Sequence, residues 1–80
     1  MNTLIGDIGN TDIKLCLLNS NFKIIKKITF DKNRANSIIF LKKKINSLIN
    51  KKKTNKVSLF SSVVPTVYKI INKLLIKNFN

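Results

Sequence analysis

The 80-residue sequence is poor in several features that would otherwise restrict its function. It has a single cysteine, Cys16, and so no disulfide framework, which suits a reducing cytosol and a buried thiol. No apolar run approaches the roughly 18 residues of a membrane span, and the first residues lack the basic start of a signal peptide. There is also no internal repeat and no low-complexity linker. We therefore expect one small domain in the cytoplasm, without a membrane partner.

Acidic residues are scarce as well, with three Asp or Glu against sixteen Lys or Arg and a formal net charge of +13. Such an excess ordinarily suggests nucleic acid or an anionic membrane. Fifteen of the sixteen are lysines, however, which are poorly suited to bidentate readout, and aromatic residues do not accompany them. Lys, Asn and Ile make up half of the chain and share A- and T-rich codons. We favour this compositional explanation and expect no specific nucleic acid, with a small lysine-rich nucleic-acid-binding protein as the alternative.

The most informative stretch is residues 4–18, in which two strand-like segments flank Gly9-Asn10. This pattern predicts a β-hairpin with a type II′ turn, because Gly takes a positive φ without strain. The pairing would place Asp7 opposite Asp12, with Lys14 diagonal to Asp7. The apolar face of the hairpin would collect Leu4, Gly6, Ile8, Thr11, Ile13, Leu15 and Leu17.

The other face of this hairpin would carry two carboxylates, which repel each other and require a cation. Lys14 supplies part of that charge, and a bound metal could supply the rest. Small polar donors at the tip, with an Asp and a Lys behind them, suit a Mg²⁺-bound phosphate. The alternative is that Asp7, Asn10 and Asp12 are ordinary turn formers.

The remainder of the chain predicts one more antiparallel strand and then two helices with a strand between them. Residues 22–30 read as the third strand of a meander, with Phe22, Ile24, Ile28 and Phe30 on one side. Helical periodicity follows from about Arg34 to Asn50, with Asp31 or Asn33 as a cap. Its buried stripe would be Ile38, Leu41, Ile45, Leu48 and Ile49.

A fourth strand is expected over Lys56 to Ser61, parallel to an earlier one because it follows a helical crossover. The second helix should begin at Pro65 and run to about Lys77, with Val67, Ile70, Ile71, Leu74 and Leu75 buried. Ser61 and Ser62 then lie between the end of a strand and the start of a helix, where ligands gather in open α/β sheets. For Ser62 alone, a helix cap is the simpler role.

Two motifs resemble those of type III pantothenate kinases, which belong to the acetate and sugar kinase, Hsp70 and actin superfamily. The first is D-x-G-N-T-x-x-K over residues 7–14, similar to the first phosphate-binding motif of that family. The second is S-S-V-V-P over residues 61–65. The sequence departs from the family at Cys16, where Gly is expected, and at Gly6, where a bulkier apolar residue is usual.

The resemblance implies an α/β fold: a ribonuclease H-like (actin-like ATPase) half-domain of order β-β-β-α-β-α, with an antiparallel meander in a mixed sheet. Residues 1–80 would be the N-terminal part of this ATP-binding domain, incomplete at the C-terminus. It also implies a kinase that transfers the γ-phosphate of ATP to pantothenate, in the first step of coenzyme A synthesis. The implied phosphate-binding residues are Asp7, Ile8, Gly9, Asn10, Thr11, Asp12, Ile13 and Lys14.

Within that motif the resemblance implies that Asp7 binds Mg²⁺. For the whole family it also implies a monovalent cation (K⁺ or NH₄⁺) and a homodimer. The family's G-x-D-R segment, whose Asp is the catalytic base, is absent from these 80 residues. No catalytic residue is therefore assigned, and we expect either an N-terminal part of the kinase or a truncated product that is inactive alone. Another ATP-binding member of the actin-like superfamily is a further alternative.

Overall fold

The structure, a computed structural model, describes residues 1–49, 53–55 and 57–79 of the chain. Its elements in order are β1 (Thr3–Ile8), β2 (Asp12–Leu18), β3 (Ile24–Asp31), the 3₁₀ helix η1 (Lys32–Asn36), α1 (Ile38–Leu48), β4 (Leu59–Ser62) and α2 (Pro65–Phe79). The strands form one sheet of order β3-β2-β1-β4. Neighbours pair antiparallel from β3 to β1, whereas β4 is parallel to β1. The predicted β-β-β-α-β-α order and the parallel fourth strand are confirmed.

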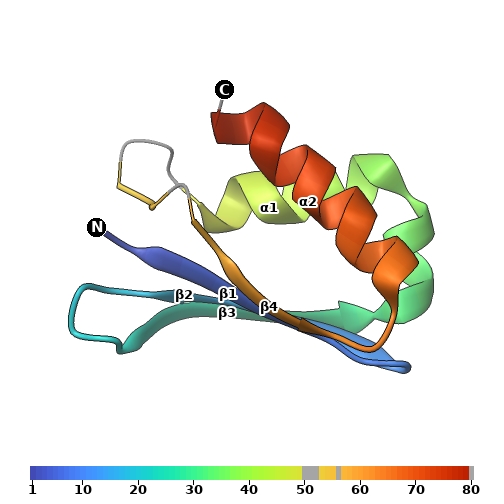
Figure 1. Cartoon of the computed structure of the whole chain (residues 1–80), viewed down its shortest axis with the longest axis horizontal. Helices are drawn as coiled ribbons and strands as arrows, with labels where there is room; N and C mark the ends of the chain where they lie inside the picture. The colour runs from blue at the N-terminus through green and yellow to red at the C-terminus, as the bar shows by residue number, and fades with distance from the viewer. Residues whose placement is uncertain (50–52, 56, 80) are drawn as a thin grey trace.

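Both helices lie on the same side of the sheet (Figure 1). Because successive strand residues point to opposite faces, one residue in two of β1 and β2 faces the helices. Leu4, Ile8, Ile13 and Leu15 on that face are completely buried. The helices contribute the buried residues Leu41, Ile45, Leu48, Val67, Ile71 and Leu75. The helix-facing side of the sheet is therefore the hydrophobic core. No helix in the described part of the chain is long and apolar enough to cross a membrane.

The register of the β1–β2 hairpin differs from the predicted one by two residues. Asp7 pairs with Lys14, and the predicted apposition of Asp7 and Asp12 is wrong. The predicted type II′ turn is also wrong, because neither glycine has a positive φ. The chain reverses through Asn10 and Thr11, closed by the Gly9 N–H donating to the Asp12 carbonyl at 3.0 Å. This register places Lys14 opposite Asp7, an attractive cross-strand pair, where the predicted register would oppose two carboxylates.

Gly6 on β1 permits a close approach between β1 and β4. A Cβ built at this position would meet the ring of Phe60, its neighbour in the parallel register, and would lie 3.1 Å from Leu15 Cδ2. The Phe60 ring thus occupies the space above Gly6 on the core face. This explains why a small residue stands where a bulkier one was expected.

The third strand begins later than predicted, because Phe22 lies in the preceding turn with φ 62° and is 79% exposed. A register shift at Leu17/Leu18 then places Ile24 opposite Leu18, and Ile24 is also exposed. Ile28 and Phe30 do face the core, as predicted. Beyond such an irregularity, residues that alternation would place on one face of the sheet lie on the other face. Simple alternation of residues cannot predict this change.

The first helix also begins later than predicted. Asp31 caps the short η1 by accepting the Asn33 N–H at 2.8 Å, and Ser37 caps α1 by accepting the Phe40 N–H at 3.2 Å. Starting α1 at Ile38 leaves that side chain 56% exposed, so its predicted burial is wrong. The predicted α2 is confirmed from Pro65 onwards.

Two predicted boundaries, the helix end at Asn50 and the strand start at Lys56, lie outside the described residues. Within the described part, β4 covers Leu59–Ser62, so its start at Leu59 follows the predicted one by a few residues. The Val63 N–H extends this pairing by donating to the Ile8 carbonyl at 3.0 Å.

Candidate phosphate-binding site

The face of the sheet that the helices leave open carries a polar row across all four strands. Asp7 is adjacent to Lys14 on one side and to Ser61 on the other, and Lys14 is in turn adjacent to Thr29. Directly paired residues point to the same face, so these four side chains lie together. All four are exposed. The row thus offers a carboxylate, an ammonium group and two hydroxyls to solvent.

The tip of the β1–β2 hairpin adjoins this row. Asn10 and Thr11 form the reversal, and their side chains are exposed. The Thr11 carbonyl accepts the Lys32 N–H at 2.9 Å, which joins the tip to the end of β3. The Gly9 N–H is already used by Asp12, so the backbone donors left for a ligand are those of Asn10 and Thr11. A Cβ at Gly9 would lie 3.2 Å from the Asp12 carbonyl oxygen, which favours glycine where the two strands converge.

The structure divides the eight predicted site residues between the two faces. Asp7 and Lys14 lie on the open face, and Gly9, Asn10 and Thr11 form the adjoining tip. Ile8 and Ile13 are completely buried in the core, so any contact with a ligand would fall to their backbone.

Asp12 lies on the open face, but it pairs with Asp31 on β3 and not with Asp7. The Asp31 carboxylate is engaged in capping η1, where it accepts a backbone N–H at 2.8 Å. The pairing of two aspartates that was expected between the first two strands therefore occurs in the register between the second and third.

The two serines of the second motif have different surroundings. Ser62 Oγ accepts the Val64 N–H at 3.1 Å in the turn before α2. Because α2 begins at Pro65, Ser62 is not the N-cap of this helix, and the predicted cap is replaced by a turn that precedes it. Ser61 is the direct neighbour of Asp7, at the carboxyl ends of β1 and β4. Sequence reasoning gave Ser61 no individual role, because the β1–β4 pairing joins residues more than fifty positions apart. The available signals were its position at the end of a strand before a helix and its place in the S-S-V-V-P motif.

The donor types in this row suit Mg²⁺. Magnesium prefers hard oxygen ligands, keeps several waters and is commonly held by one or two carboxylates together with substrate phosphates. Asp7 supplies one exposed carboxylate, the adjacent Ser61 supplies a hydroxyl, and Thr11 at the hairpin tip exposes another. No group of three or more His, Cys, Asp or Glu gathers among the described residues. The arrangement thus fits an ion shared with a phosphate better than one enclosed by protein alone.

Comparisons with known proteins point to one family. The family model of type III pantothenate kinase matches residues 3–80. A type III pantothenate kinase of Pelagibacter ubique (strain HTCC1062) is 37% identical over 68 residues, which cover 85% of this chain and 27% of the relative. The chain therefore spans about a quarter of the length of that relative. No solved structure gives a significant match.

Proposed function

Because the chain belongs to the type III pantothenate kinase family, we propose that its β1–β2 hairpin binds the phosphate tail of ATP for transfer to pantothenate. The observation that carries the proposal is the placement of Asp7, Lys14 and Ser61 side by side on the open face, next to the exposed tip. The first two come from the phosphate-binding motif, and Ser61 comes from the second motif.

Each residue has a chemical role in this proposal. Asp7 would hold Mg²⁺ through its carboxylate, with water and phosphate oxygens among the other ligands. The Asn10 and Thr11 N–H groups and the Thr11 hydroxyl would donate to phosphate oxygens, and Lys14 would neutralise charge beside Asp7. Bound Mg²⁺ would supply charge neutralisation at the β- and γ-phosphates.

The transfer step itself needs a base that orients the pantothenate hydroxyl, and we assign that role to no residue of this chain. The chain has three acidic residues. In this proposal Asp7 holds the metal ion. Asp12 on β2 is paired with Asp31 on β3, away from the Asp7–Ser61 pair. The match covers 27% of the Pelagibacter relative. We propose that the base, the pantothenate contacts and the monovalent cation site (K⁺ or NH₄⁺) lie in the remaining part of the full-length kinases. A homodimer is likewise a proposal for the whole protein.

The test is a calorimetric titration of the 80-residue chain with ATP in the presence and absence of Mg²⁺. We expect binding that requires Mg²⁺ and that weakens about tenfold or more in Asp7→Asn, because a charge-assisted contact is lost. Asp31→Asn is the matched control: it removes the same charge, and Asn still caps η1, so affinity should stay within about twofold. Equal weakening in both variants would contradict the proposal. Binding that ignores Mg²⁺ and falls steeply with salt would also contradict it and would favour non-specific attraction to lysines.

A further inference from the structure

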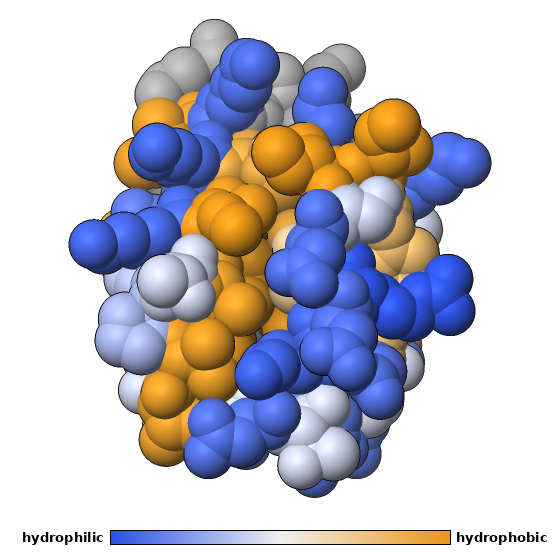
Figure 2. Space-filling model, turned by 90° about the vertical axis from the view of Figure 1, so that its right-hand side faces the viewer, coloured by the Kyte–Doolittle hydropathy of each residue, from blue (hydrophilic) through white to orange (hydrophobic). Residues whose placement is uncertain are grey.

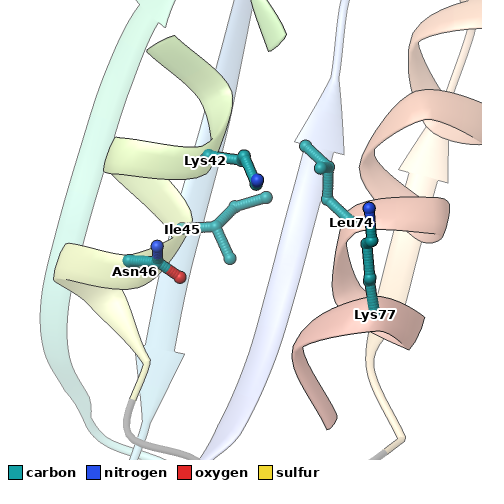
Figure 3. Close-up of a pocket in the computed structure, with 5 residues that line it drawn as sticks. All are labelled: Lys42, Ile45, Asn46, Leu74 and Lys77. Carbon is teal, nitrogen blue, oxygen red and sulfur yellow. The ribbon is translucent and has the colours of Figure 1, made fainter. Parts of the chain in front are cut away.

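The two helices enclose a groove on the side of the molecule away from the open sheet face. It consists of two adjoining hollows of about 230 and 390 Å³, which share Leu74 and Lys77 as lining residues. Lys42 and Ile45 extend from α1, and Leu74 extends from α2, into the space between the helices (Figure 3). The groove therefore has walls from both helices and runs along them.

The floor of the groove is apolar. Ile45 is buried, Ile70 and Leu74 are half-buried, and Ile38 at the start of α1 is exposed. Ile70 and Leu74 are four residues apart and so lie on one stripe of α2. Seen from the end at which both helices begin, a hydrophobic band runs between clusters of hydrophilic side chains (Figure 2).

The rim of the groove is positively charged. Lys42 stands on α1, and Lys73 and Lys77 stand four residues apart on α2. All three are exposed. Neither helix contains an acidic residue, because the three carboxylates of the chain lie on the strands. The chain therefore has no helical carboxylate with which to neutralise this rim.

We propose that this groove binds an acidic amphipathic helix of a partner protein, with its apolar stripe on the floor and its carboxylates against the three rim lysines. A helix laid between two others buries apolar residues at i, i+3, i+4 and i+7, which matches a trough lined from both sides. The distance from Ile70 to Lys77 along α2 is about 10 Å, or about two turns of such a helix. A flat bilayer fits a concave trough poorly, and the rim lacks the aromatic residues on which single-stranded nucleic acid stacks. This binding is independent of ATP binding, since the groove and the polar row lie on opposite sides of the sheet.

The probe is a fluorescein-labelled helical peptide of about four turns, with Leu at i, i+3, i+4 and i+7 and Glu on the flanks, followed by fluorescence anisotropy. The test variant of the full 80-residue chain is Lys42→Glu/Lys73→Glu/Lys77→Glu. The matched control is Lys23→Glu/Lys27→Glu/Lys53→Glu, which changes the charge equally at exposed positions outside the groove. We expect the groove variant to weaken binding at least about tenfold and the control to weaken it less than about twofold. Leu74→Ala, checked for folding by circular dichroism, should weaken binding several-fold by removing part of the floor.

Several results would overturn the proposal. Equal weakening in the two charge variants would mean that net charge alone attracts the peptide, and equal binding of a scrambled peptide of the same composition would mean that helical patterning is irrelevant. Sedimentation showing self-association that only the groove variant abolishes would assign the groove to a second copy of this chain. Binding to phosphatidylglycerol vesicles or RNA that the groove variant abolishes, without peptide binding, would assign it to those ligands. Asp7→Asn should leave peptide affinity unchanged, so this test and the ATP test fail independently.

Discussion

The two faces of the sheet consist of alternate residues of the same strands, yet they have opposite physical properties. The helix-facing side buries Leu4, Ile8 and Ile13 completely. The open side exposes Asp7, Lys14 and Ser61. In our proposal, stability and phosphate binding therefore depend on alternate residues of the same adjacent strands. This comparison teaches that the two properties can be changed separately, by substitutions one position apart.

The largest effect on stability should come from the buried face. Leu15→Ala removes a completely buried side chain and should lower the free energy of unfolding by about 2–5 kcal/mol. Urea unfolding followed by circular dichroism measures this loss. The adjacent Lys14→Met, on the exposed face, should change stability by no more than about 0.5 kcal/mol. Similar losses in both variants would show that the two faces are not distinct.

A smaller loss is expected where the two parallel strands approach most closely. Gly6→Ala places a methyl group against the Phe60 ring and should cost about 1–3 kcal/mol of unfolding free energy. The cost should shrink when Phe60→Ala is already present, because the obstructing ring is gone. Thermal or urea unfolding of the two single variants and the double variant measures this coupling. Strict additivity would mean that the ring does not occupy the space above Gly6.

The sequence was sufficient for the order of elements and for the faces of the hairpin, but not for its pairing. Alternation in β1 and β2 predicts which residues are buried, and a shift of two residues preserves the faces, whereas a shift of one would have reversed them. Asp7 and Lys14 were therefore expected on the same face although the register was wrong. Sequence alone could not decide whether Gly9-Asn10 or Asn10-Thr11 forms the tip, because both pairs tolerate a turn.

Other features depend on contacts between distant segments. The place of Ser61 beside Asp7 follows from pairing between β1 and β4, and local periodicity carries no information on that register. The register irregularity at Leu17/Leu18, beyond which Ile24 is exposed, also cannot be predicted from the two-residue alternation of a strand. At the start of α1, Asp31 or Asn33 was the predicted cap, whereas the structure uses Asp31 for η1 and Ser37 for α1.

The smallest effects should distinguish the two serines of β4. Ser62→Ala removes the acceptor of the Val64 N–H and should cost about 0.5–1 kcal/mol of stability while leaving ATP affinity unchanged. Ser61→Ala should leave stability within about 0.5 kcal/mol and weaken Mg²⁺-dependent ATP binding about two- to threefold. Urea unfolding and ATP calorimetry on both variants test these two expectations. If Ser61→Ala lowered stability and Ser62→Ala weakened ATP binding instead, Ser61 would not belong to the proposed site.

The most direct test of the phosphate site is the backbone amide NMR spectrum of the chain during titration with ATP, with and without Mg²⁺. We predict shifts concentrated at residues 7–14 and at Ser61 that disappear when Mg²⁺ is omitted. Shifts that centre instead on Lys42, Lys73 and Lys77 and persist without Mg²⁺ would contradict the account. Such a result would place the nucleotide in the helical groove and leave the open face of the sheet without a ligand.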